Sequence, residues 1–264
     1  MDLGTTKMIA RTEGGIGWMI FNQPEKHNAV SYEMWLAVPK IMAAFEADPQ
    51  VRVIVLAGAG ERAFVSGADI SEFEKKRGTT DAIKVYDDAG NAAHAALNAA
   101  QKPMISMIRG ICIGGGLAIT LSTDLRICSS DSVFSVPAAR LGLGYRYSGI
   151  KKLVDIVGPA FAKEIFFSAG KFTAEDARIM GLVNRVVPPG ELEAYVQKLA
   201  SIISGNAPLT IKAAKLAINA AVEDPDKRRF HDIDAAIKTC FASEDYIEGR
   251  RAFMEKRKPA FKGK

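Results

Sequence analysis

Cysteine is scarce in this sequence, and the positions of the few cysteines exclude several kinds of site. The three cysteines, Cys112, Cys128 and Cys240, form no Cys-x-x-Cys pair. Because the first two lie in apolar runs, we expect buried, reduced thiols of a cytosolic protein rather than disulfides or catalytic groups. The sequence also has no cluster of His, Cys, Asp and Glu with metal-ligand spacing, so we expect no metal site.

Long apolar runs are missing as well. The most apolar window, residues 104–122, is interrupted by Arg109 and by four glycines, which argues against a membrane-spanning segment. The N-terminal residues MDLGTTKMIARTEGG contain neither the apolar core of a signal peptide nor an Arg-rich amphipathic stretch. We therefore expect a cytoplasmic protein without a membrane partner.

The composition is that of an ordinary folded protein with one basic end. Of its 264 residues, 48% are hydrophobic and 25% are charged, which is enough apolar sequence to bury a sizeable core. The net charge of +5 is concentrated in residues 250–264. Such a basic cluster fits nucleic acid, a membrane surface or a polyphosphorylated ligand, unless it is only a solvated tail.

Strand and helix patterns alternate over the first 189 residues, which is typical of an α/β fold. Alternating or β-branched runs predict strands at 7–12, 17–22, 51–58, 104–110, 125–130 and 133–136. Helical spacing predicts helices at 31–48 with Ser31 as its cap, at 70–100, from the glycines at 114–116 to about Ser122, and as a pair at 153–169 that is split at Gly158. Residues 58–70 are predicted to form a polar loop.

Strand patterns stop near Pro189. Residues 191–205, 209–224 and 230–256 have helical patterns, and the last of these is predicted as a single amphipathic helix. We therefore expect two regions, an α/β core at 1–189 and a helical region at 190–264.

Two glycine-containing loops share one design, in which an apolar strand leads through a turn into the start of a helix. They are SGADI at 66–70 and IGGGLA at 113–118. A missing side chain lets a ligand approach the backbone, and the first N–H groups of a helix have no acceptor inside it. A phosphate-binding P-loop is disfavoured because Leu117 and Ala118 replace its Gly-Lys-Ser/Thr ending. Close packing of a helix on a strand is the structural alternative for the glycines at 114–116.

The chain resembles the enoyl-CoA hydratase/isomerase, or crotonase, superfamily over nearly its whole length. Four stretches carry the resemblance: PEKHNAVS at 24–31, AFVSGADI at 63–70, IRGICIGGGLAITLSTDLRI at 108–127 and SEDYIEGRRAFMEKRKPAF at 243–261. The resemblance implies a spiral of ββα units, with the CoA and acyl pocket in the core region. It also implies a C-terminal helical region that assembles homotrimers, often paired into homohexamers.

The resemblance also assigns roles to particular residues. It implies that the backbone N–H groups of Ala68 and Gly115 form an oxyanion hole around the carbonyl oxygen of an acyl-CoA thioester. Preorganised donors of this kind stabilise the negative charge that develops on such an oxygen. The other positions implied to bind substrate or CoA are Lys26, His27, Ser66, Asp69, Ile70, Phe253 and Lys256, the last two from the same chain or from a neighbouring subunit. The phosphates of CoA would also account for the basic end without nucleic acid, and no cofactor is expected beyond this CoA moiety.

The sequence departs from the family at two positions. Hydratases of the family use two glutamates around a water molecule, and alanine stands at both of these positions, Ala118 and Ala138. Since a methyl group is neither an acid nor a base, we expect hydration to be impaired. Decarboxylation of a malonyl-type acyl-CoA needs only the oxyanion hole and a proton donor, so it is the leading expectation, with Tyr145 as the candidate donor.

The segment around Tyr145 also resembles methylmalonyl-CoA decarboxylases, although those have glutamate and histidine where this chain has Ala118 and Ala68. Two alternatives remain open: an enoyl-CoA hydratase with substitute acid and base groups, and a non-catalytic acyl-CoA-binding subunit. The side chains that could replace the missing glutamates or pair with a substrate carboxylate are Tyr86, Asp87, Asp88, His94, Arg140 and Arg146.

Overall fold

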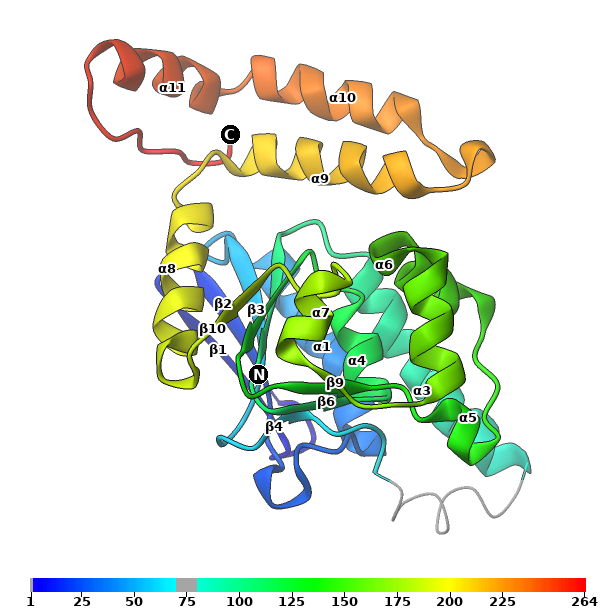
Figure 1. The fold of residues 1–264 in the computed structure, drawn as a ribbon. Helices are drawn as coiled ribbons and strands as arrows, with labels where there is room; N and C mark the ends of the chain where they lie inside the picture. Colours follow the sequence, from blue (N-terminus) through cyan, green and yellow to red (C-terminus); the bar gives the residue numbers. More distant parts are fainter. Residues whose placement is uncertain (1, 70–79) are drawn as a thin grey trace.

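Two β-sheets organise the core of this chain, for which a computed structural model describes residues 2–69 and 80–264 (Figure 1). The larger sheet has six strands in the order β1-β2-β3-β5-β7-β10. Only the β1–β2 hairpin is antiparallel in this sheet, and the other neighbours are parallel. The strands are β1 Met8–Glu13, β2 Ile16–Phe21, β3 Val53–Gly58, β5 Met104–Ile108, β7 Leu125–Ser129 and β10 Arg185–Val187.

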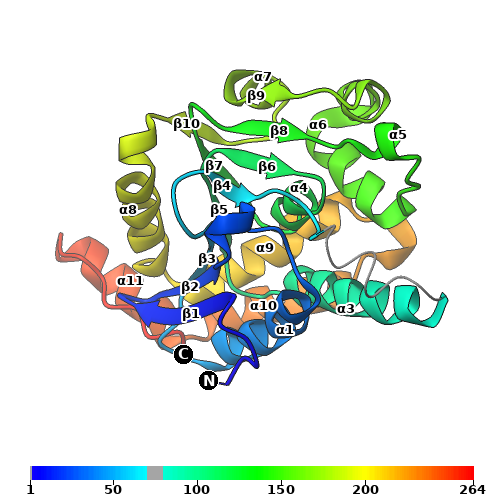
Figure 2. The same ribbon diagram turned by 90° about the horizontal axis from the view of Figure 1, so that it is seen from below.

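The smaller sheet has four strands in the order β4-β6-β8-β9, which lie side by side in Figure 2. They are β4 Ala63–Val65, β6 Ile111–Ile113, β8 Val133–Ser135 and β9 Phe172–Thr173. Consecutive strands alternate between the sheets, since β3, β5 and β7 belong to the larger sheet and β4, β6 and β8 to the smaller. A helix follows each such pair, which is the expected repeating ββα order.

Ten α-helices of the described chain surround and extend the two sheets. They are α1 Tyr32–Ala47, α3 Thr80–Asn98, α4 Gly115–Thr120, α5 Ala138–Leu141, α6 Tyr147–Ser168, α7 Ala174–Ile179, α8 Leu192–Ser204, α9 Pro208–Val222, α10 Phe230–Phe241 and α11 Glu244–Met254. The predicted cap of α1 is confirmed, because the Ser31 side chain accepts the N–H of Met34. The predicted split in α6 is also confirmed, with Gly158 at a non-helical φ of 75°.

Several sequence expectations were wrong in detail. The predicted polar loop at 58–70 contains β4, and β6, β9 and β10 were not predicted. Each of these strands has only two or three residues, too few to show an alternating pattern. The single helix predicted at 230–256 is two helices, because the Ser243 side chain caps a new helix by accepting the N–H of Tyr246.

The core lies mainly between the sheets and the helices that cover them. Helix α8 packs its buried Leu192, Val196 and Ala200 against strands of the larger sheet, and α1 lies beside α3 in the other main cluster. Cys112 and Cys128 are buried as expected, and Cys240 is half-buried. Burial is the largest cause that raises the pKa of the Cys128 thiol to about 12. In the described chain, no helix is long and apolar enough to cross a membrane.

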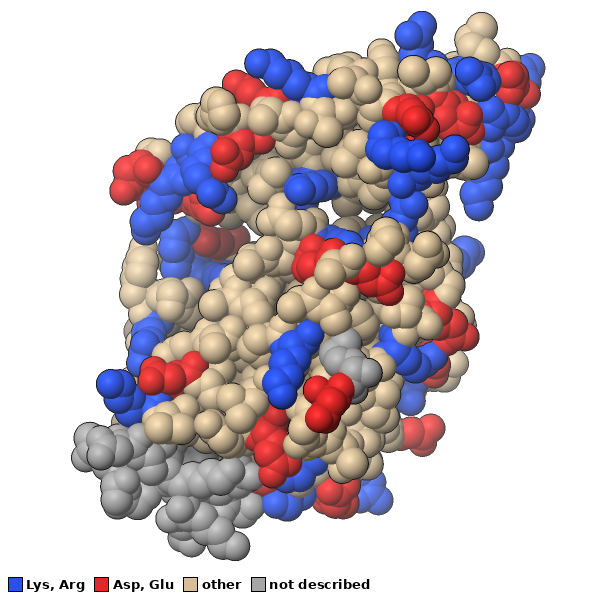
Figure 3. Space-filling model, turned by 180° about the vertical axis from the view of Figure 1, so that it is seen from behind, with Lys and Arg blue, Asp and Glu red and all other residues tan. Residues whose placement is uncertain are grey.

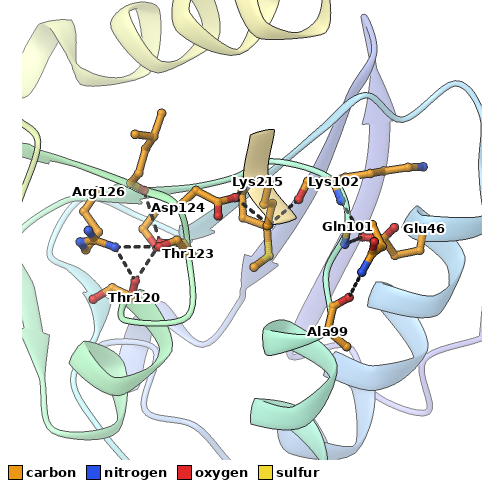
Figure 4. Close-up of polar contacts among 12 residues, drawn as sticks. Glu46, Ala99, Gln101, Lys102, Thr120, Thr123, Asp124, Arg126 and Lys215 are labelled. Carbon is orange, nitrogen blue, oxygen red and sulfur yellow. Dashed lines mark hydrogen bonds and ion pairs between the residues drawn. The ribbon is translucent and has the colours of Figure 1, made fainter. Parts of the chain in front are cut away.

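From α8 onward the chain is helical, and α9, α10 and α11 form a layer above the core in Figure 1. One lysine fastens this layer to the core, as Figure 4 shows. The Lys215 ammonium on α9 donates to the Asp124 carboxylate and to the Lys102 carbonyl, both at 2.8 Å. The same carboxylate accepts the N–H of Met104 at 2.7 Å, so Asp124 holds both the start of β5 and helix α9.

We expect Lys215→Met to lower the free energy of unfolding by about 1–3 kcal/mol, because it leaves Asp124 half-buried without its cation. Lys212→Met, at an exposed position one turn earlier on the same helix, is the matched control and is expected to change stability by less than about 0.5 kcal/mol. Urea unfolding of both variants measures the difference. Equal stabilities would show that the ion pair does not fasten the C-terminal layer.

Candidate active site

The loop after β4 is held by the chain around Val30. The N–H of Val30 donates to the Gly67 carbonyl at 2.8 Å, and the N–H of Asp69 donates to the Val30 carbonyl at 3.0 Å. Val30 and Ala68 thus form an isolated parallel bridge. Because backbone groups alternate in direction along an extended chain, the N–H of Ala68 points away from Val30.

On that other side lies the start of α4. A Cβ atom placed on Gly115 would lie 3.6 Å from the nitrogen of Ala68 and 3.7 Å from the carbonyl carbon of Gly67. Gly115 is the first residue of α4, so its own N–H has no acceptor within the helix. Neither this N–H nor that of Ala68 takes part in any backbone hydrogen bond among the described residues. The structure thus brings the two predicted donor residues side by side, with no side chain on Gly115 between them.

Each of the three consecutive glycines is needed for a different physical reason. Gly114 has a φ of 55° and a ψ of −113°, which a residue with a side chain rarely adopts. A Cβ on Gly116 would lie 2.1 Å from the Val65 carbonyl oxygen, so this glycine allows α4 to pack closely on β4. The packing alternative therefore holds for Gly116, while the position of Gly115 keeps the space in front of Ala68 empty.

Asn28 organises the neighbouring loop, and the sequence analysis did not single it out. Its side chain is fully buried, donates to the carbonyls of Ala59 and Ala63 at 2.9 and 2.8 Å, and accepts the N–H of Gln23 at 2.9 Å. Its φ is 55°, a conformation that asparagine tolerates better than most residues. The asparagine inside the PEKHNAVS motif was the available signal.

Lys26 and Asp69, both predicted to lie at the site, contact each other. The Lys26 ammonium donates to the buried Asp69 carboxylate at 2.8 Å. The N–H of Ser66 donates to the His27 carbonyl at 3.1 Å, and the Ser66 hydroxyl donates to the Lys26 carbonyl. These contacts give Asp69 the role of a loop brace and place Lys26 and His27 beside the Ala68 loop. Ile70, the remaining predicted residue of this loop, lies outside the described residues.

The two positions that lack glutamate are close to this arrangement in the fold. Ala118 is half-buried and lies one turn after Gly115 on α4. Ala138 is buried and begins α5, three residues after Ser135, whose carbonyl accepts the N–H of Gly114 at 2.9 Å. Neither position has a group that could transfer a proton.

Tyr145 lies between α5 and α6 and is half-buried. Its ring packs edge-on against Phe166, with 5.0 Å between the ring centroids. Burial raises the pKa of the Tyr145 hydroxyl, so the hydroxyl keeps its proton at neutral pH. Arg140 and Arg146 are exposed, and among the described residues neither makes a hydrogen bond or ion pair with the Ala68 loop.

The candidates on α3 differ in their surroundings. The buried hydroxyl of Tyr86 accepts the indole N–H of Trp35 at 3.1 Å and donates to the Val30 carbonyl at 3.2 Å. The His94 ring packs on Trp35 at 5.5 Å. Burial, followed by the charge of Lys152, lowers the pKa of His94 to about 4, so His94 is neutral at pH 7. Asp87 is half-buried and Asp88 is exposed.

The C-terminal candidates lie elsewhere. Helix α11 and β4 are at opposite ends of the molecule in Figure 1, and Phe253 on α11 is 83% exposed. A single chain therefore does not bring Phe253 and Lys256 to Lys26 and His27. Figure 3 shows lysines and arginines gathered around α11 and the tail. The exposed basic residues there are Arg250, Arg251, Lys256, Arg257, Lys258, Lys262 and Lys264.

Two carboxylates of α11 fold this tail back, and sequence reasoning missed both. Asp245 is buried and accepts the N–H groups of Lys262 and Gly263 at 2.6 and 2.8 Å. Glu248 accepts two hydrogen bonds from Arg257 and one from the N–H of Ala260. Part of the C-terminal stretch that carries the family resemblance is thus explained by tail folding rather than by ligand contacts.

We expect Gly115→Ala to change stability little and Gly116→Ala to lower it strongly. The new methyl at Gly115 meets the Ala68 nitrogen at an ordinary contact distance of 3.6 Å, so stability should change by less than about 1 kcal/mol. At Gly116 the methyl would overlap the Val65 carbonyl, and we expect a loss of more than about 2 kcal/mol. Thermal unfolding compares the two; an unstable Gly115→Ala variant would show that no open space faces Ala68.

Comparison with known proteins identifies the family to which this chain is similar. The family model described as "Enoyl-CoA hydratase/isomerase" matches residues 11–264. A short-chain-enoyl-CoA hydratase of Clostridium acetobutylicum is 35% identical over 251 residues, which cover 95% of both chains. A crotonyl-CoA hydratase of Syntrophomonas wolfei is 32% identical and covers 96% of this chain and 97% of its own.

Solved structures give the same result for the fold. A crystal structure of an enoyl-CoA hydratase/carnithine racemase from Magnetospirillum magneticum superposes with a TM-score of 0.90 at 32% identity, covering 98% of this chain and 97% of its own. The similarity therefore includes both sheets, the glycine loops and the C-terminal helices. By its sequence and its fold, this chain belongs to the enoyl-CoA hydratase/isomerase (crotonase) superfamily.

Proposed function

We propose that this chain binds an acyl-CoA thioester and stabilises its enolate between the N–H groups of Ala68 and Gly115. The observation that carries the proposal is the closeness of the two segments, since a Cβ on Gly115 would lie 3.6 Å from the Ala68 nitrogen and Gly115 has no side chain to stand there. A thioester oxygen in that space would accept two hydrogen bonds as it gains negative charge. Loss of one such donor lowers an enzymatic rate by about 10²- to 10³-fold.

The reaction that we propose first is hydration of an α,β-unsaturated acyl-CoA. Two relatives with full coverage are named as a short-chain-enoyl-CoA hydratase and a crotonyl-CoA hydratase, which favours this reaction over decarboxylation. In hydration, the oxygen of water bonds to the β-carbon and gives up one proton to a base. The C=C electrons form the Cα–C1 bond of the enolate as the carbonyl electrons move onto the thioester oxygen, and the α-carbon takes a proton when the enolate collapses. The Ala68 and Gly115 donors would stabilise the negative charge on the thioester oxygen of this enolate intermediate.

Hydration also needs a base for the water and an acid for the α-carbon, and Ala118 and Ala138 supply neither. Each such group contributes about 10²- to 10⁴-fold to a rate. Another side chain must therefore act, or hydration must be slow. Tyr145 is our candidate acid, because the raised pKa of its hydroxyl keeps the proton in place at neutral pH.

Decarboxylation of a malonyl-type acyl-CoA is the second candidate, and the two alanines favour it. Cleavage of the bond between the carboxylate and the α-carbon releases CO₂ and leaves its electron pair as the same enolate, which a proton then quenches. No base is needed. The relatives described above are named hydratases, so they lend no support to the expected resemblance to methylmalonyl-CoA decarboxylases.

The CoA end of the substrate leads us to propose a homotrimer or homohexamer. Lys26 and His27 lie beside the Ala68 loop, whereas Phe253 and Lys256 lie at the far end of the same chain. We propose that these two residues enclose the CoA bound by a neighbouring subunit. No cofactor beyond the CoA moiety is required for either reaction.

An assay of the purified protein with crotonyl-CoA, malonyl-CoA and methylmalonyl-CoA separates the candidates. We expect slow hydration of crotonyl-CoA, measured as the loss of absorbance of its conjugated thioester. Gly115→Ala keeps its N–H, but its methyl would displace the thioester oxygen from the donor pair, so we expect an about 10²-fold loss of rate. Release of CO₂ from either malonyl ester without hydration would favour decarboxylation, and Tyr145→Phe should then slow it. Tight binding without turnover of any ester would contradict both reactions and favour a non-catalytic subunit.

Restoring one carboxylate tests whether the alanines limit hydration. Ala118→Glu places a carboxylate one turn after Gly115, and we expect crotonyl-CoA hydration to rise about 10- to 100-fold. Ala43→Glu, at an exposed position of α1, adds the same charge on another helix and should have no effect. An unchanged rate in Ala118→Glu, with intact binding, would show that position 118 does not face the reacting carbons.

A further inference from the structure

Tyr86 connects the middle of α3 to the backbone that holds the Ala68 loop. Its side chain is buried, with 6% of its surface exposed, and its hydroxyl donates to the Val30 carbonyl at 3.2 Å. The indole N–H of Trp35 on α1 donates to the same hydroxyl at 3.1 Å. The Tyr86 hydroxyl thus links α3 and α1 to the Val30 carbonyl.

That carbonyl is a key acceptor of the site. It also accepts the N–H of Asp69 at 3.0 Å, while the N–H of the same Val30 donates to the Gly67 carbonyl at 2.8 Å. The two residues that flank Ala68 are therefore both fixed to Val30. Any shift of Val30 along this bridge moves the N–H of Ala68 relative to Gly115.

We propose that Tyr86 is a positioning residue for the Ala68 N–H donor, which acts by fixing the Val30 carbonyl. This inference rests on the proposed function, because it concerns the same pair of donors. A role for Tyr86 as a proton donor to substrate does not fit its surroundings, since its hydroxyl is buried and donates to Val30. Displacement of a catalytic group by about 1 Å can reduce a rate by up to 10²-fold, so a single remote hydrogen bond is sufficient to matter.

The direct test is Tyr86→Phe, which removes one oxygen atom and keeps the ring. Tyr195→Phe removes a hydroxyl from a half-buried tyrosine of α8 that packs on the larger sheet, and is the matched control. The readout is the absorbance of bound para-dimethylaminocinnamoyl-CoA, whose maximum moves to longer wavelength when its thioester carbonyl is polarised. Thermal unfolding of each variant is measured alongside.

We expect the wild type and Tyr195→Phe to produce the same red shift, and Tyr86→Phe to bind the probe but lose at least half of the shift. With the ester that the enzyme turns over, kcat of Tyr86→Phe should fall about 10-fold while KM changes less than about 2-fold, because contacts to CoA are unaffected. A purely structural role would lower the melting temperature without changing the red shift of the folded protein.

The outcomes separate this inference from the function on which it rests. Bound probe without a red shift in the wild type would contradict the proposed donor pair itself. A red shift in the wild type that Tyr86→Phe fully retains, with unchanged kcat, would contradict the positioning role alone. An equal loss in Tyr195→Phe would show that the effect is not specific to the Val30 carbonyl.

Discussion

The proposed site depends on one constraint, which is that two backbone N–H groups from distant parts of the chain must face the same oxygen atom. Backbone donors cannot be placed by side-chain choice, so the path of the chain has to place them. The bridge to Val30 turns the N–H of Ala68 outward, and the absence of a side chain at Gly115 keeps the opposite side open. At Gly116, close contact with the Val65 carbonyl brings α4 near enough for the pair to form.

The ββα order explains why these segments meet. Strands β4 and β6 are parallel neighbours in the smaller sheet, so the loops that follow them leave from the same edge. One loop carries Ala68 and the other leads into α4. The far end of α4 is also fixed, because the buried Arg126 guanidinium donates to the carbonyls of Thr120 and Thr123, as Figure 4 shows. The helix that presents Gly115 is therefore held at both ends.

Sequence patterns predicted the long elements, and the family resemblance supplied the proposed donor pair, but neither gave the contacts that hold these segments. Strands such as β3 have six residues and a clear β-branched run, whereas β4 and β6 have three residues and are defined by their partners. Ala68 and Gly115 were identified through the family resemblance. Asn28 and Tyr86 donate to backbone carbonyls, and although the PEKHNAVS motif contains Asn28, a single sequence does not show which carbonyls such side chains reach. The positions of Phe253 and Lys256 depend on how the C-terminal layer docks, which local patterns do not encode.

The surroundings of the donors narrow the search for the missing acid and base. A substitution can remove a carboxylate without disturbing the fold, and Ala118 and Ala138 sit in an intact framework of glycines and hydrogen bonds. On α3, the Tyr86 hydroxyl is hydrogen-bonded to the Val30 carbonyl, and the neutral His94 ring packs on Trp35. Tyr145 differs from both, because packing against Phe166 involves only its ring and burial leaves its hydroxyl protonated. A site with a stabilised enolate oxygen and one weak acid suits reactions that end in protonation of the α-carbon, and water activation is the step for which it is least equipped.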